Sequence, residues 1–285
     1  MNKANFLIVD GYPKSSRDDF DKAGMKHAWR LYAQMLQRHL PEAQYSVWFP
    51  SDTPELPDGM GPEQYAGVLW TGCNLTIYHD DDERVTRQIP LAQKAYEVGT
   101  PQFGSCWGLQ MAVVAAGGKV EANPLGREMG LARKVHLTTK GKAHPFMQGK
   151  PEVYSGFISH VDQVTELPTG AELLATNDFT RVQALAIRHE AGEFWATQYH
   201  PEYDLFEVAR LFIARESKLL GENFFEDHDS LVKYVTKMEA LSKEPQRKDL
   251  RWQLDIDDDV LDADTRQTEF GNWLQHLVLP QLESD

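Results

Sequence analysis

The chain has 285 residues, of which 41% are hydrophobic and 25% are charged, so it can bury a large core. Its formal net charge of −14 argues against a nucleic-acid or anionic-membrane partner, because a broadly acidic surface would repel both. The sequence has no apolar run of membrane-spanning length, no signal peptide, and too few cysteines for a disulfide scaffold. These features predict a globular cytoplasmic protein that binds neither membranes nor nucleic acids.

The first part of the chain alternates between two hydrophobic patterns. Short apolar runs typical of strands occupy 5–10, 45–49, 66–70 and 101–103, and apolar residues at helical spacing occupy 25–40 and 83–98. A charged loop is expected over 12–21. Strands that alternate with helices predict an α/β fold with a doubly wound, mostly parallel sheet.

The second part is richer in strands and ends in helices. Strand-like runs occupy 131–137, 152–158, 171–176, 182–188 and 192–199, and helical spacing continues over 205–220. From Ser217 onward the chain has 16 acidic and 8 basic residues. We therefore expect one domain over 1–216 and an acidic, helical C-terminal extension over 217–285. The apolar stripe around Trp273 must be buried, either on the main domain or in a partner.

The segment Gly104-Ser105-Cys106-Trp107-Gly108 follows a short apolar run and precedes good helix formers. This order predicts a nucleophile elbow with a cysteine in the nucleophile's place. The two glycines let strand and helix approach closely, so that the central residue can occupy a strained conformation. Cys106 would lie at a helix N-terminus, whose free N–H groups favour an anionic sulfur. The alternative is a buried structural cysteine between two packing glycines.

A second motif, Gln198-Tyr-His-Pro-Glu202, ends the last predicted strand. A cysteine nucleophile needs a base, and the base needs a carboxylate that orients its ring. His200 and Glu202 can supply both from one rigid turn, although a lone histidine more often has a structural role. The pairing of this turn with the elbow favours the catalytic interpretation.

Together, the two motifs resemble the class I (triad) glutamine amidotransferase family, over roughly residues 6–215. The similarity is to stand-alone members, to the glutaminase domain of GMP synthase and to γ-glutamyl peptidases. It implies a flavodoxin-like sheet and a Cys106–His200–Glu202 catalytic triad. It also implies that no metal and no cofactor is needed.

The same resemblance implies further site residues. Thr71-Gly72-Cys73 occupies the place of the family's oxyanion loop, so that the N–H groups of Cys73 and Trp107 would form the oxyanion hole. Cys73 stands where the family has a second glycine. Gln110, Ser159 and His160, together with Gly72, match positions at the family's substrate pocket. Asp162 is interpreted as a structural cap.

The expected reaction is hydrolysis of the side-chain amide of glutamine, or of a γ-glutamyl amide, through a Cys106 thioester. Ammonia would pass to an acceptor on a separate synthetase. Only about seventy residues follow the last predicted helix of the domain, and these are too few to form a synthetase domain. The first alternative is a self-sufficient γ-glutamyl hydrolase or peptidase. The second is a binding or regulatory module without turnover.

Overall fold

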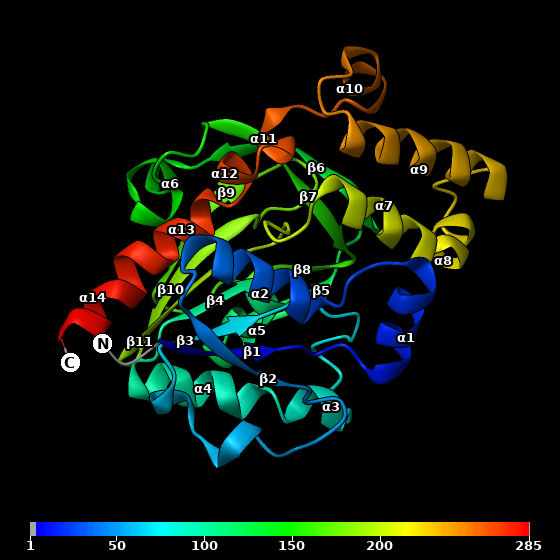
Figure 1. Ribbon diagram of the computed structural model, residues 1–285. Coiled ribbons are helices and arrows are strands. Elements are labelled where there is room, and N and C mark those ends of the chain that lie inside the picture. Colours follow the sequence, from blue (N-terminus) through cyan, green and yellow to red (C-terminus); the bar gives the residue numbers. More distant parts are fainter. Residues whose placement is uncertain (1–3, 285) are drawn as a thin grey trace.

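The computed structural model describes residues 4–284 (Figure 1). The strands are β1 (Asn5–Val9), β2 (Gln44–Trp48), β3 (Gly67–Trp70), β4 (Gln102–Ser105), β5 (Lys119–Ala122), β6 (Glu128–Leu137), β7 (Val153–His160), β8 (Asp162–Glu166), β9 (Ala171–Thr176), β10 (Ala184–His189) and β11 (Gly192–Thr197). The helices before β11 are α1 (Lys14–Ala23), α2 (Ala28–His39), α3 (Glu83–Thr86), α4 (Ile89–Val98), α5 (Trp107–Ala115) and α6 (Thr139–Ala143). The later helices are α7 (Leu205–Ala214), α8 (Glu216–Gly221), α9 (His228–Lys243), α10 (Lys248–Leu254), α11 (Asp258–Leu261), α12 (Ala263–Arg266), α13 (Thr268–Trp273), η4 (Leu274–Val278) and α14 (Leu279–Ser284).

Over these residues, the central sheet has the strand order β2-β1-β3-β4-β11-β10-β9-β6-β7. The strands from β2 to β11 in this order are parallel, and the pairings from β11 to β7 are antiparallel. A separate antiparallel pair joins β5 to β8. The predicted α/β fold with a doubly wound, mostly parallel core is therefore confirmed.

Alternate side chains of the central strands enter two different cores. On β1, Phe6 and Ile8 pack with α2, whereas Leu7 and Val9 pack with α4 and α5. Such alternation follows from the two-residue repeat of a strand, and helices on both faces make β1 a continuous apolar run. The ends of β4 and β11 lie in the middle of this sheet, where a parallel sheet presents its carboxyl edge to a ligand.

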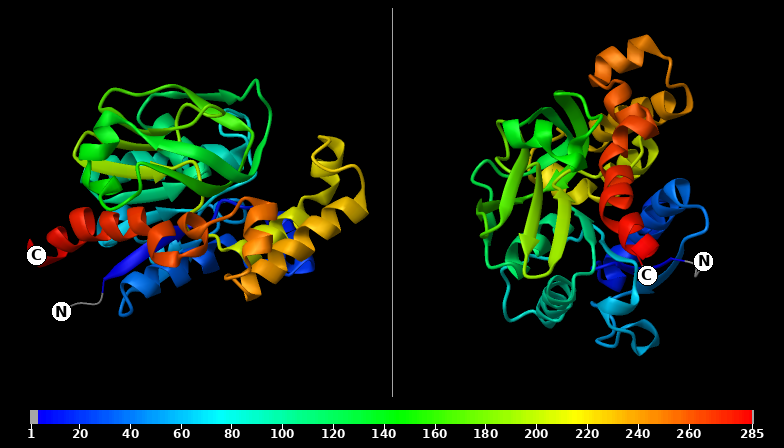
Figure 2. Two further views of the ribbon diagram at one scale, coloured as in Figure 1. Left: turned by 90° about the horizontal axis from the view of Figure 1, so that it is seen from above. Right: turned by 90° about the vertical axis from the view of Figure 1, so that its left-hand side faces the viewer.

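The C-terminal helices return to the main domain. Phe270, Trp273, Leu274 and Val278 belong to the same apolar core as Phe6. In both views of Figure 2 these red helices run beside the blue N-terminal part, while α9 packs on α7 and the orange α10 lies farther out. The stripe around Trp273 is therefore buried within the chain itself. The division at residue 216 stays a prediction.

The structure corrects three expectations about helices. The helix expected over 83–98 is divided into α3 and α4, with Pro90 in the first turn of α4. The loop expected over 12–21 contains α1, whose buried Phe20 and Ala23 form its apolar side and whose C-terminus is closed by Gly24 at φ 72°. The helix expected over 205–220 is broken at Arg215, whose φ of −110° and ψ of 10° separate α7 from α8. Within the described chain, no helix combines the length and apolarity that a membrane crossing requires.

Candidate active site

Cys106 occupies the sharp turn between β4 and α5. Its φ of 52° and ψ of −98° lie outside the backbone regions that residues other than glycine ordinarily adopt. Its side chain is almost fully buried. The two flanking glycines make the turn possible. A β-carbon on Gly104 would lie 2.7 Å from the Cα of Gly108, and one on Gly108 would lie 2.8 Å from the Trp70 carbonyl oxygen. The backbone therefore has the form expected of a nucleophile elbow.

His200 and Glu202 lie just beyond β11, which is paired with β4. The Nδ1 atom of His200 is 2.6 Å from Oε1 of Glu202, and both side chains are buried. Ser105 Oγ donates to the same carboxylate oxygen over 2.9 Å. Because the Ser105 hydroxyl has one hydrogen, the Tyr32 hydroxyl, 2.7 Å away, donates to Ser105. This chain of hydrogen bonds orients the carboxylate, and Tyr32 and Ser105 are members that the sequence motifs did not indicate.

Two residues pack closely against the imidazole of His200. The ring stacks on Tyr203, with ring centroids 4.1 Å apart and an interplanar angle of 6°. Gly72 also contacts the ring, because a β-carbon on it would lie 2.8 Å from Cε1 of His200. The Nε2 atom is buried and has no hydrogen-bond partner within residues 4–284. This nitrogen is thus free to exchange a proton with Cys106 or with a substrate.

Charge at this site favours the imidazolium. Burial disfavours the charged ring, but the Glu202 carboxylate and the nearby Cys106 together outweigh burial and raise the pKa of His200 from 6.5 to about 9. At neutral pH the ring therefore carries a positive charge beside Cys106.

This pKa predicts how stability depends on pH. Because the folded-state pKa is raised, the stabilisation is complete below pH 6.5 and is lost as the pH rises through about 9. A shift of this size corresponds to roughly 3 kcal/mol of unfolding free energy. Urea unfolding between pH 6 and 10 should show this loss in the native protein but not in His200→Gln. Parallel curves for the two proteins would contradict the prediction.

The predicted oxyanion donors lie on the loop after β3 and at the start of α5. The Trp107 N–H is at the first position of α5, where a helix provides no internal acceptor. The Thr71 hydroxyl donates to the Gly72 carbonyl oxygen over 2.8 Å and so restrains the peptide that carries the Cys73 N–H. The geometry is compatible with an oxyanion hole, whose assignment to these two N–H groups stays a prediction.

A cavity of about 240 Å³ opens above Cys106. Gln110, Ser159 and His160 line it together with Cys73, whereas Gly72, which was also expected at the substrate pocket, does not. The role of these residues in substrate binding stays a prediction. The Ser159 hydroxyl is buried without a partner among the described residues, and the Cys106 thiol lies 3.7 Å from the Ser159 carbonyl oxygen.

His160 differs from its neighbours because both ring nitrogens already have partners. Nδ1 is 2.8 Å from the Asp162 carbonyl oxygen, and Nε2 is 3.0 Å from the Glu128 carboxylate. These contacts favour a supporting role for the His160 ring in the pocket wall.

The comparison with protein families agrees with this geometry. The family model described as "Glutamine amidotransferase class-I" matches residues 35–216. The chain belongs to the class I glutamine amidotransferase family. It is therefore an amidohydrolase, as the sequence predicted.

Relatives within this family differ in how much of the chain they match. A γ-glutamyl-L-1-hydroxyisopropylamide hydrolase of a Pseudomonas species is 32% identical over 98% of this chain and 95% of its own length. A GMP synthase of a Nitratiruptor species is 31% identical over 60% of this chain. The matched segment is 31% of that enzyme, so the similarity covers about a third of the synthase.

Solved structures of the family show the same fold. A glutamine amidotransferase from Thermotoga maritima covers 98% of this chain and 100% of its own, with a TM-score of 0.67 at 16% identity. One from Methylobacillus flagellatus covers 99% and 95%, with a TM-score of 0.63 at 15% identity. Both matches extend through the C-terminal helices.

The pocket of this amidotransferase-family chain has a charged wall that the motifs did not predict. Arg127, Arg215 and Lys218 line it together with Tyr78 and Asp162. The Tyr78 hydroxyl donates to the Asp162 carboxylate over 3.1 Å, and burial raises the pKa of Asp162. Arg215 and Lys218 reach the pocket because the helix breaks at Arg215. The sequence does show two cations about one helical turn apart, Arg215 and Lys218. Whether both face the pocket depends on the break between α7 and α8, which the sequence did not predict.

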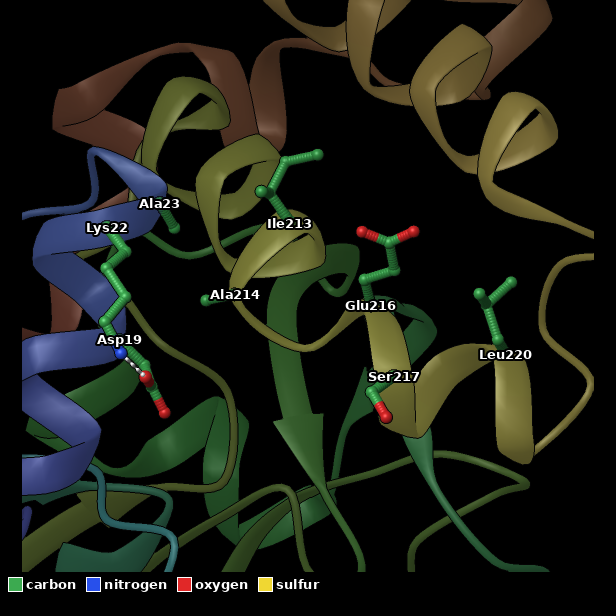
Figure 3. A pocket seen from close by; sticks show the side chains of 8 residues that line it. All are labelled: Asp19, Lys22, Ala23, Ile213, Ala214, Glu216, Ser217 and Leu220. Atoms are coloured by element: carbon green, nitrogen blue, oxygen red, sulfur yellow. Dashed lines mark hydrogen bonds and ion pairs between the residues drawn. The ribbon is translucent and has the colours of Figure 1, made fainter.

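A second, larger hollow of about 660 Å³ lies on the other side of α8, between α1 and α7 (Figure 3). Its charged groups already have partners. Lys22 pairs with Asp19 over 2.8 Å, and Glu216 pairs with His228 over 2.5 Å. Cys106 does not line this hollow. The smaller cavity above Cys106 is therefore the candidate active site.

Proposed function

We propose that the chain hydrolyses γ-glutamyl amides without a synthetase partner. The observation that carries the proposal is the extent of similarity to the Pseudomonas γ-glutamyl amide hydrolase, which includes nearly the whole of both chains. The similarity to GMP synthase covers 60% of this chain and omits most of the synthase. Arg215, between α7 and α8, and Lys218, on α8, help to build the pocket above Cys106.

In this proposal, Cys106 is the nucleophile. His200 Nε2 already holds the thiol proton, so the sulfur attacks the amide carbon as an anion, and the N–H groups of Cys73 and Trp107 stabilise the oxyanion. His200 then gives the proton to the amide nitrogen, the C–N bond breaks, and the amine leaves a γ-glutamyl thioester. Water attacks the thioester and passes a proton to Nε2. Glutamate leaves as the C–S bond breaks, and Nε2 keeps the proton beside the sulfur anion.

The remaining pocket residues are assigned to substrate binding. Gln110 and the free Ser159 hydroxyl can bind the polar groups of the γ-glutamyl moiety. The Asp162 carboxylate accepts a hydrogen bond from the Tyr78 hydroxyl. We assign it to bind the α-ammonium group of the γ-glutamyl moiety. Glu202, held by Ser105, orients the imidazole and stabilises its charged form.

The test is release of glutamate by the purified chain from glutamine and from a panel of γ-glutamyl amides, with Cys106→Ala as the blank. We expect kcat/KM for at least one γ-glutamyl amide to exceed that for glutamine by tenfold or more. Turnover of glutamine alone would favour the other candidate, a glutaminase that supplies ammonia to a synthetase. The absence of any Cys106-dependent turnover would refute the proposed function.

A further inference from the structure

Glu128, at the start of β6, is a buried carboxylate that the proposed reaction does not use. Asn177 Nδ2 donates to its Oε1 over 2.8 Å, and Gln183 Nε2 and Thr180 Oγ1 donate to its Oε2 over 3.1 and 3.2 Å. A further partner is Nε2 of His160, 3.0 Å from Oε2. These hydrogen bonds offset the cost of removing a carboxylate from water, so the position of the Glu128 side chain is closely fixed.

One of these partners belongs to the wall of the substrate cavity. His160 lines the cavity above Cys106, whereas Glu128 and its other three partners do not. Those three partners lie over 177–183, in the connection between β9 and β10. They hold the carboxylate, and the carboxylate holds the His160 ring. Glu128 therefore acts on the cavity wall through His160 rather than by direct contact.

The His160 ring carries this link to the next residues of the chain. Glu128 and His160 are opposite each other in the pair at which the β6–β7 ladder ends. From there the chain turns into β8, and Nδ1 of His160 is 2.8 Å from the Asp162 carbonyl oxygen. A ring bound at both nitrogens cannot rotate without losing a hydrogen bond. The link from Glu128 therefore restrains the turn that follows β7.

The segment 159–162 forms the cavity wall beside Cys106, and each of its residues lines the cavity. The Ser159 carbonyl oxygen is 3.7 Å from the Cys106 thiol, and the Ser159 hydroxyl is buried without a partner among the described residues. The Ser159 hydroxyl and the Asp162 carboxylate are the groups assigned above to the γ-glutamyl moiety. Displacement of this segment would change where the substrate amide lies relative to the sulfur, and reaction rates depend steeply on that alignment.

We propose that Glu128 is a positioning residue for substrate binding. Through His160 it fixes Ser159 and Asp162 where they can hold a γ-glutamyl group against Cys106. This inference rests on the proposed hydrolysis of γ-glutamyl amides and adds to it a residue that neither sequence motif contains. The hydrogen-bond partners of Glu128 lie outside the catalytic triad. Its loss should therefore weaken substrate binding and leave the nucleophile reactive.

The first test compares two electrophiles that share one reactive group. The chloroketone analogue of glutamine uses the γ-glutamyl pocket, whereas chloroacetone alkylates Cys106 without it. The native protein should react with the analogue at least about a hundredfold faster than with chloroacetone. Glu128→Gln should slow the analogue about tenfold and leave the rate with chloroacetone unchanged. Peptide mass spectrometry measures both rates, with Cys106→Ala as the blank.

Glu207→Gln is the matched control. Glu207 is also a buried carboxylate, its partner is Lys26, and it does not line the cavity. Its replacement should leave both alkylation rates unchanged. If Glu128→Gln slows both reagents equally, or slows neither, Glu128 does not position the substrate and the inference is wrong. Equal rates with the two reagents in the native protein would instead refute the γ-glutamyl pocket, and with it the proposed function.

Turnover provides a second readout. Interactions that are equally strong in the bound substrate and in the transition state affect KM rather than kcat. Glu128→Gln should therefore raise KM for a γ-glutamyl amide about tenfold and change kcat by less than about threefold. Added to His160→Ala, the same substitution should change KM by less than about twofold, because the link is already broken. A tenfold rise in both backgrounds, or a fall in kcat alone, would overturn the inference.

Discussion

Replacing Cys106 with alanine is expected to lower γ-glutamyl amide hydrolysis by at least about 10⁴-fold, to the level of the blank. The sulfur at this turn is the atom proposed to form the thioester, and the other groups of the site act on it or through it. His200 cannot substitute for it, because its Nδ1 is bound to Glu202 and its Nε2 is the proton carrier. Glutamate release measured at saturating substrate, with far-ultraviolet circular dichroism to check folding, tests the prediction.

The other thiol provides the matched control. Cys73 lines the same cavity, but burial raises its pKa, so it stays protonated at neutral pH. A γ-glutamyl-mimicking electrophile should therefore label residue 106 in the native protein and in Cys73→Ala, whose backbone N–H is unchanged. Peptide mass spectrometry locates the adduct. Full activity in Cys106→Ala, or an adduct on Cys73, would show that the nucleophile has been assigned wrongly.

Replacing Trp273 with alanine is expected to lower the free energy of unfolding by about 3–5 kcal/mol. The Trp273 ring is fully buried, and its centroid lies 5.7 Å from that of Phe103 on β4 and 5.6 Å from that of Phe270. Its edge also packs on Gly67, where a β-carbon would lie 2.8 Å from Cη2. Removing the indole would leave a cavity between the C-terminal helices and two central strands. Urea unfolding measures the loss.

Trp252 on α10 is the matched control, because 82% of its surface is exposed. Trp252→Ala should change the unfolding free energy by about 0.5 kcal/mol or less. Similar losses for both tryptophans would mean that the C-terminal helices do not pack on the sheet as described. A second link between these regions is the buried pair of Lys150 and Glu269, 2.8 Å apart, since Glu269 also accepts from the Tyr199 hydroxyl next to His200.

The fold class followed from patterns that lie within short segments. Buried parallel strands such as β1 are continuous apolar runs because both faces are covered, and α2 has one apolar stripe because only one face is covered. The elbow was also predictable, because a strained turn of this kind needs glycine where strand and helix meet. These requirements are local, so each produces a pattern of neighbouring residues that can be recognised in the sequence.

Two expectations about helices failed for a related reason. The charged segment over 12–21 forms α1 because Phe20 and Ala23 find a partner surface on α7, which lies far away in the sequence. The residue at the break between α7 and α8 is Arg215, which is neither proline nor glycine. The sequence therefore has no local signal that would have predicted the break. Neither outcome depends on local propensity alone, since tertiary packing supplies most of the stability of a short helix.

By itself, the sequence determined the family, the α/β sheet and the two motifs that place Cys106, His200 and Glu202 at one edge of that sheet. Only the tertiary structure decided which charges face the nucleophile. Arg127 precedes β6, Arg215 lies at the break between α7 and α8, and Lys218 lies on α8. Whether each is paired or free depends on distances between those segments. Charges interact through space rather than along the chain. The balance of charges in the pocket therefore could not be predicted from the sequence and required the tertiary structure.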